Sequence, residues 1–369
     1  MIDCDVHNTW ESVRDIRPYL APAFRDWFDY GEVPGSKPAF PAAHRPWLHP
    51  EDFKRTDAQP RNGGGAGSDY ALICEQLLDR YEIDYAVLTG DEPIEVSTLA
   101  NPYYAQALAA ASNEYLIEQW LPRDRRFLGS LVVAPQDPHG AAREIRRLGD
   151  TPGIVQVLVS SGAQRPYGDP FYHPIWDACA EVGLPFAVHL GGTAGVNAIP
   201  TGCGPSTFFW ETHALYCETG MGHLASVIAH GVFEKWPSAR FVLIECGVAW
   251  VPALLWRLDA DYRALRKETP WLKRLPSEYA REHIRVTTQP LEQPRDPKAL
   301  WPALADIGAE EMLMFASDYP HWDFDDPTLL RLPAESREAI VDGNARALYK
   351  LPERGRELSS AAVSGDPAH

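Results

Sequence analysis

Residues 2–8, IDCDVHN, form a segment of strand length that carries an acid and a histidine near its end. In a β-strand, residues i and i+2 point to the same face, so Asp5 and His7 are expected to project together. Seven more strand-length runs follow along the chain, separated by helical patterns. The predicted strands are 2–8, 84–90, 126–134, 153–160, 184–190, 239–246, 284–289 and 312–318, and the predicted helices are 69–82, 101–120, 139–148, 170–182, 213–236, 249–266, 294–307 and 334–349.

This alternation predicts the fold class. Strands that each precede a helix are typical of a parallel sheet with crossovers, and eight such units indicate a closed α/β barrel, the (β/α)8 TIM barrel. We expect one barrel domain over residues 1–355 and a polar tail over 356–369. A long insertion at 11–68 and a long loop at 191–212 follow the first and fifth strands. Both would lie at the carboxyl ends of the strands, where barrel active sites are built.

Composition excludes several classes of partner. The net charge of −17, from 51 acids against 34 lysines and arginines, argues against nucleic acid and against anionic membrane surfaces. The apolar runs are of strand length and far short of a membrane span. Six cysteines without a CxxC pair indicate reduced thiols, and the N-terminus lacks the pattern of a signal peptide. We therefore expect a cytoplasmic protein that acts on a small molecule.

Titratable residues close several of the predicted strands: Asp5 and His7 the first, His189 the fifth, Glu245 the sixth and Asp318 the eighth. Taken alone, a strand-end histidine is commonly a hydrogen-bonded core residue, and Asp318 could cap the following helix. Because barrel closure brings the first strand beside the eighth, however, these residues can converge. Imidazoles and carboxylates suit Zn²⁺, and the oxygen ligands make Mn²⁺ an alternative.

With these positions in place, the chain resembles the amidohydrolase superfamily, in the branch of aminocarboxymuconate-semialdehyde decarboxylase and γ-resorcylate decarboxylase. The motifs that carry the resemblance are IDCDVH (2–7), LICEQLLDRYEIDYAVL (72–88), LPFAVHLGG (184–192), GVFEKWPSARFVLIECGVAWVP (231–252), IRVTTQP (284–290), MLMFASDYPHWD (312–323) and DGNARALY (342–349). The resemblance implies a metal held by Asp5, His7, His189 and Asp318. Asp5 stands where many relatives have a histidine, and Glu245 stands where the decarboxylases often have a histidine that moves protons.

The two-metal members of the superfamily bridge their ions with a lysine carbamate or a carboxylate on the fourth strand. The fourth predicted strand here, GIVQVLVSSG (153–162), has neither residue, so the resemblance implies a single divalent ion. Our leading interpretation is a non-oxidative decarboxylase, a carbon–carbon lyase, acting on a small aromatic or unsaturated carboxylic acid. The alternative is a hydrolase that uses metal-activated water on an ester, lactone, amide or C–C bond. A minor alternative is a barrel that binds without catalysis. The resemblance also implies a homo-oligomer, most simply a dimer.

Further residues are assigned more loosely. Proton transfer is expected from Asp318 or Glu245, and His213 and His321 are additional catalytic candidates because both lie in loops near strand ends. His223 and His230 share one helix face, where structural packing is the plainer reading. Basic residues that could pair with a substrate carboxylate lie on loops: Arg45, Lys54 and Arg165. The aromatic residues expected at the substrate pocket are Trp10, Phe209, Trp210 and Trp322.

Overall fold

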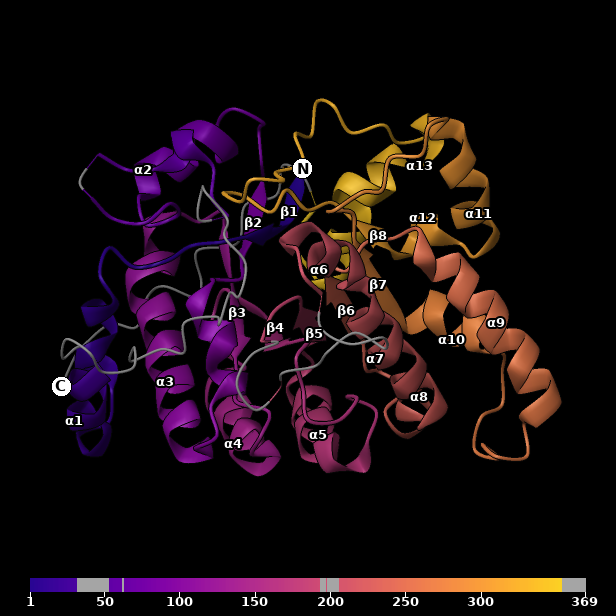
Figure 1. The fold of residues 1–369 in the computed structure, drawn as a ribbon, viewed down its shortest axis with the longest axis horizontal. Helices are drawn as coiled ribbons and strands as arrows, with labels where there is room; N and C mark the ends of the chain where they lie inside the picture. The colour runs from indigo at the N-terminus through magenta and orange to yellow at the C-terminus, as the bar shows by residue number, and fades with distance from the viewer. Residues whose placement is uncertain (32–52, 62, 193–196, 198–205, 354–369) are drawn as a thin grey trace.

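The computed structural model of the protein describes residues 1–31, 53–61, 63–192, 197 and 206–353. Eight strands form one sheet in the order of the chain, and helices surround it (Figure 1). The strands are β1 (Ile2–Val6), β2 (Tyr85–Leu88), β3 (Phe127–Val132), β4 (Ile154–Ser160), β5 (Phe186–His189), β6 (Phe241–Ile244), β7 (Ile284–Thr287) and β8 (Leu313–Met314). The helices are α1 (Pro22–Gly31), α2 (Tyr70–Ile73), α3 (Pro102–Tyr115), α4 (Pro138–Leu148), α5 (His173–Val182), α6 (Phe209–Leu215), α7 (Cys217–Ala229), α8 (Val232–Lys235), α9 (Trp250–Leu265), α10 (Pro276–His283), α11 (Leu300–Asp306), α12 (Ala309–Met312), α13 (Ala334–Glu338) and α14 (Asn344–Leu348).

The sheet closes on itself between β1 and the segment that follows β8. Val6 forms a parallel bridge with Tyr319, and the His7 amide donates to the Tyr319 carbonyl over 2.7 Å. The Asp318 amide donates to the Asp5 carbonyl over 3.2 Å. These bonds place the ends of the first and eighth strands side by side. The predicted (β/α)8 barrel is therefore confirmed.

All eight predicted strands are present, and each is shorter than expected. β3 and β4 are buried along their whole length, which explains their nearly continuous apolar sequences. The predicted helix at 213–236 is divided into α6, α7 and α8, and Gly231 takes a left-handed φ of +69° between the last two. The helix α10 was not predicted from the sequence. The predicted tail at 356–369 lies outside the described residues.

The described end of the first insertion lies along the loop after β8. Lys54 forms an antiparallel bridge with His321, the Arg55 amide donates to the Pro320 carbonyl over 2.9 Å, and the Trp322 amide donates to the Phe53 carbonyl over 3.1 Å. We call Phe53–Arg55 the strap. It brings part of the insertion to the carboxyl ends of the strands, as expected from its position in the chain. No helix among the described residues is long and apolar enough to cross a membrane.

Candidate metal centre and active site

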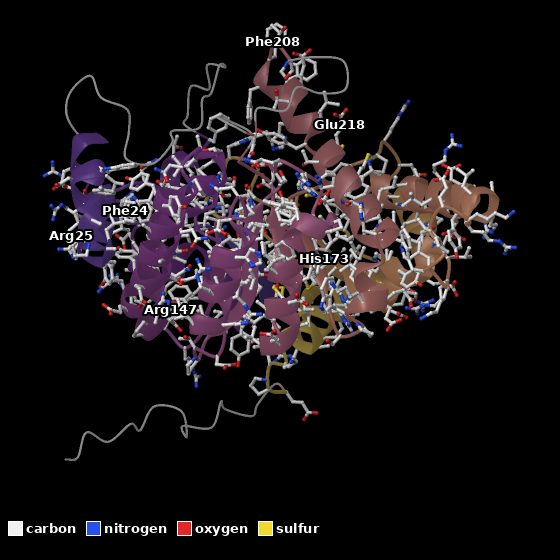
Figure 2. All side chains as sticks on the ribbon, turned by 90° about the horizontal axis from the view of Figure 1, so that it is seen from below. Phe24, Arg25, Arg147, His173, Phe208 and Glu218 are labelled. Atoms are coloured by element: carbon white, nitrogen blue, oxygen red, sulfur yellow. The ribbon has the colours of Figure 1, made fainter. Side chains whose placement is uncertain are left out.

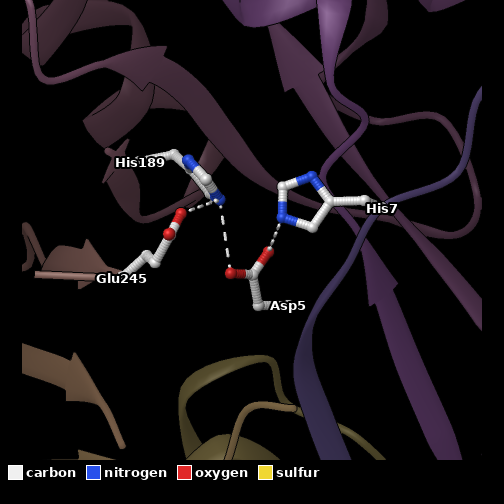
Figure 3. Close-up of side chains that lie close together, drawn as sticks. All are labelled: Asp5, His7, His189 and Glu245. Atoms are coloured by element: carbon white, nitrogen blue, oxygen red, sulfur yellow. Dashed lines mark ion pairs between the residues drawn. The ribbon is translucent and has the colours of Figure 1, made fainter. Parts of the chain in front are cut away.

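Asp5 lies between two histidines at the carboxyl ends of the strands (Figure 3). One carboxylate oxygen, Oδ1, is 3.4 Å from His7 Nε2, and the other, Oδ2, is 3.2 Å from His189 Nε2. All three side chains are essentially buried. The Thr89 hydroxyl, just past β2, donates to Asp5 Oδ1 over 2.6 Å and fixes the orientation of the carboxylate. The period-two prediction that Asp5 and His7 project together is thus consistent with their contact.

The other ring nitrogen of each histidine faces a backbone carbonyl. His7 Nδ1 is 2.7 Å from the Gly90 oxygen, and His189 Nδ1 is 2.5 Å from the Leu190 oxygen. A carbonyl only accepts hydrogen bonds, so Nδ1 must carry the proton in each neutral ring. Nε2 of each ring then carries no proton and presents a free lone pair, and a neutral imidazole binds a metal through such a nitrogen.

These lone pairs point at carboxylate oxygens. Within the described part of the chain, His7 Nε2, His189 Nε2 and Asp5 Oδ2 are buried and have no hydrogen-bond partner. Lone pairs of nitrogen and oxygen at such distances repel one another unless a proton or a cation lies between them. Without a metal ion, His189 and His7 outweigh the opposing effect of burial and hold the pKa of Asp5 below its ordinary value. The residues present therefore fit a divalent cation.

Two further acids each lie beside one of these histidines. Glu245 Oε2 is 3.6 Å from His189 Nε2, and Asp318 Oδ1 is 2.8 Å from His7 Nε2. Glu245 follows β6 directly and Asp318 lies four residues beyond the end of β8, and both take left-handed backbone conformations, with φ of +57° and +61°. Positive φ is uncommon for residues other than glycine and is concentrated at functional sites. At these two positions it determines the direction in which each carboxylate leaves its strand.

The two acids differ in their hydrogen bonding. Both oxygens of Asp318 accept hydrogen bonds, Oδ1 from His321 Nδ1 over 2.7 Å and Oδ2 from the Gln289 amide over 3.3 Å, and Oδ1 also faces the bare Nε2 of His7. Against the effect of burial, His321 and His7 lower the pKa of Asp318 to about 2. Among the described residues, no side chain or amide donates a hydrogen bond to the Glu245 carboxylate. Burial and neighbouring carboxylates, Asp318 foremost, raise the pKa of Glu245 well above its ordinary value.

Asp91 joins the site and was missed by the sequence analysis. Its Oδ1 lies 2.8 Å from His7 Nδ1, and its Oδ2 lies 2.5 Å from Lys54 Nζ. Asp91 follows shortly after β2, so the strand-end rule that selected Glu245 and Asp318 would have found it. Lys54, which the sequence analysis named only as a possible carboxylate partner, also contacts His321 Nε2 over 2.7 Å.

The predicted catalytic candidate His213 lies at the outer side of this cluster. Its Nε2 is 3.2 Å from Asp323 Oδ2, and Gln289 Nε2 donates to the same oxygen over 3.0 Å. One ligand atom each of His213, Glu245 and Asp323 lies within 4.8 Å of the others. His213 is therefore close enough to Glu245 to contact the same bound molecule.

The predicted pocket aromatics divide into two groups. Phe209 packs against Phe53 of the strap at a ring distance of 4.4 Å, and Trp322 packs against His213 at 5.5 Å, so both border the site. Trp10 is buried and packs edge-on against Tyr115 of α3. Trp210 is 70% exposed and stacks on Phe208, the residue just before α6, which Figure 2 shows at the tip of a segment that projects from the body of the molecule.

The two remaining basic candidates are Arg165 and Arg45. Arg165 is exposed and pairs with Asp169 at 3.4 Å. Arg45 lies outside the described residues.

The chain is similar to a known protein family and to several known enzymes. A family model described as amidohydrolase matches residues 2–351. The γ-resorcylate decarboxylases of Polaromonas sp. and Rhodococcus jostii are each 28% identical to it, over 293 and 298 residues; both alignments cover 75% of this chain and 86% of the relative. The structure of 5-carboxyvanillate decarboxylase from Novosphingobium aromaticivorans, complexed with manganese and a nitrobenzoic acid, shares the fold with a TM-score of 0.65 at 23% identity, covering 95% of this chain and 96% of that one. On the strength of the family match along nearly its whole length, this chain belongs to the amidohydrolase family.

Proposed function

We propose that this protein is a metal-dependent, non-oxidative decarboxylase of a small aromatic carboxylic acid. The observation that carries the proposal is the pair of bare Nε2 atoms, on His7 and His189, that face the Asp5 carboxylate in a buried site. The likeness to γ-resorcylate decarboxylases over most of the chain supports decarboxylation as the reaction.

In the proposed site, Asp5, His7, His189 and Asp318 would hold one divalent ion, Zn²⁺ or Mn²⁺. When bound, the ion would polarise the carboxylate of the substrate and an adjacent oxygen and hold both in place. Thr89 and the carbonyls of Gly90 and Leu190 orient three of these ligands. Such outer partners set ligand direction and basicity.

Glu245 is the proposed proton donor. In decarboxylation the bond between the ring carbon and the carboxylate breaks, CO₂ leaves, and the electron pair stays on the ring carbon, which then takes a proton. Asp318 is engaged at both oxygens, whereas the Glu245 carboxyl accepts no hydrogen bond from the described residues and lies beside His189. A proton on Glu245 Oε2 is therefore the one free to be transferred.

The aromatic side chains at the border of the site favour the binding of a planar substrate. Phe53 and Phe209 meet edge to face, and Trp322 packs on His213. Aromatic side chains favour offset or edge-on contact with another ring. Asp323 holds the imidazole of His213 beside the site, where it can bind a polar substituent of that substrate.

The test is a substrate survey with metal-loaded protein. Hydroxylated aromatic carboxylic acids are incubated in D₂O, and CO₂ release is measured together with deuterium at the carbon that lost the carboxylate. We expect metal-dependent CO₂ release with one deuterium incorporated, abolished by a chelator. Cleavage of an ester, lactone or amide panel without CO₂ release would replace the proposal with the hydrolase, and protein that binds no metal would indicate a non-catalytic barrel.

Metal analysis of protein purified from cells grown with both ions decides between Zn²⁺ and Mn²⁺. Either ion suits two imidazoles with carboxylates, and the oxygen ligands Asp5 and Asp318 bring Mn²⁺ into competition. The dimeric state and the cytoplasmic location stay predictions from the sequence, which sedimentation and cell fractionation can check.

A further inference from the structure

Lys54, from the strap, places its ammonium group between two side chains of the site. Nζ is 2.5 Å from Asp91 Oδ2 and 2.7 Å from His321 Nε2, and the side chain is only 13% exposed. Each of these two partners in turn contacts a proposed metal ligand. Asp91 Oδ1 is 2.8 Å from His7 Nδ1, and His321 Nδ1 is 2.7 Å from Asp318 Oδ1.

The chemistry of the ammonium group fixes the direction of both chains of hydrogen bonds. Lys54 can only donate, so His321 Nε2 must accept, and the neutral ring then carries its proton on Nδ1. That Nδ1–H donates to Asp318 Oδ1. On the other side, Asp91 accepts from Lys54 with Oδ2 and faces the Nδ1–H of His7 with Oδ1, which leaves His7 Nε2 bare.

The strap carries this lysine into place by backbone contacts. The amides of Arg55 and Trp322 form two backbone hydrogen bonds between the strap and the loop after β8. His321 and Trp322 belong to that loop, only a few residues beyond Asp318. A change in how the strap docks would therefore move Lys54 relative to both chains of hydrogen bonds.

We propose that Lys54 is a positioning residue for the metal centre, acting through His321 on Asp318 and through Asp91 on His7. A consequence is that docking of the strap and binding of the metal stabilise each other, because linkage between two equilibria is reciprocal. The inference rests on the cation site of the proposed function but not on decarboxylation.

The experiment compares Lys54→Met, Lys54→Arg and Lys298→Met, the last removing a lysine charge from an exposed position. Mn²⁺ affinity is measured by calorimetry on metal-free protein. We expect Lys54→Met to weaken Mn²⁺ binding by about 10–100-fold, the usual effect of an outer partner of a metal ligand. Lys54→Arg should recover part of the affinity because the guanidinium group also only donates, and Lys298→Met should match the wild type.

Hydrogen exchange provides a readout that a general loss of stability would not produce. In wild-type protein, Mn²⁺ should slow exchange of the Arg55 and Trp322 amides, and in Lys54→Met that protection should be lost while the amides of β4 are unchanged. Wild-type affinity in Lys54→Met, or no effect of Mn²⁺ on the two amides of the wild-type protein, would overturn the inference. Metal binding with the Lys54 effect but without CO₂ release would overturn only the proposed function.

Discussion

His7 and His189 differ from His223 in what their second ring nitrogen meets. His223, on α7, is buried like the other two, and both of its nitrogens are satisfied by the backbone. Nε2 lies 2.8 Å from the Ser161 carbonyl, and Nδ1 accepts from the Tyr167 amide over 3.2 Å. His7 and His189 also give one nitrogen to a carbonyl, but their other nitrogen faces Asp5.

The difference teaches how to tell a ligand from a structural histidine. A buried nitrogen without a hydrogen-bond partner is not enough, since His283 Nε2 also has none among the described residues. His283 lies 3.5 Å from one carboxylate, that of Glu282, and stacks on Phe233. At the metal centre two such nitrogens converge on the same acid. Convergence of several unpartnered atoms, rather than burial, marks the site.

Removing one of the converging nitrogens should have the largest effect. His189→Ala is expected to lose bound metal and CO₂ release together, by more than the about 10–100-fold that a change outside the ligand set produces. Metal content and turnover measure this, with circular dichroism to check that the barrel is folded. A His189→Ala protein that retains a full equivalent of tightly bound metal would remove His189 from the ligand set.

Glu245→Gln sharpens the distinction between holding the metal and moving the proton. The amide keeps the shape of the side chain but has no acidic proton, so CO₂ release should fall by about 10²–10⁴-fold, the usual contribution of a general acid. Metal content should change little. Loss of metal in this variant would instead make Glu245, which lies near His189, a ligand.

A smaller effect is expected from Thr89→Val, which has nearly the same shape but no hydroxyl to donate to Asp5 Oδ1. Without that bond the carboxylate is less well oriented, and metal affinity should fall by about 10–100-fold. The measurement is a competition titration with a chelating dye. Thr98→Val, at another buried threonine, whose hydroxyl donates to the Glu95 carbonyl, is the control and should bind metal normally.

His223→Gln should leave metal and activity unchanged and alter only the pH dependence of stability. Burial lowers the pKa of His223 to about 4 from its ordinary value of 6.5. The unfolded chain therefore binds this proton first as pH falls, and folding loses roughly 3 kcal/mol between about pH 6.5 and 4, with none of this loss above pH 6.5. The free energy of unfolding, measured in urea at pH 7 and pH 4.5, should fall less in His223→Gln than in the wild type. An equal fall in both proteins would show that His223 is not held neutral.

Much of the fold and part of the site could be predicted from residue patterns alone. Strand and helix periodicity is local, so the eight units were found, and strand-end acids and histidines such as His189 and Asp318 followed from them. The helix α10 and the division of residues 213–236 were not predicted. Both depend on backbone conformation, such as the left-handed φ of Gly231, and on packing against other elements, which residue periodicity does not record. The assignment of Trp10 and Trp210 to the pocket stays a prediction, because position in the chain does not determine the face on which a ring packs.

The sequence by itself determined the barrel and the residues that close its strands, because alternation and apolar runs depend only on near neighbours. The tertiary structure decided how those residues meet. The positive φ of Glu245 and Asp318 sets the direction of each acid, and the carbonyls of Gly90 and Leu190 leave one bare nitrogen on each histidine. Lys54 arrives at the same site from a distant insertion. Such relations depend on barrel closure and on distances between residues far apart in the chain, which no local pattern records.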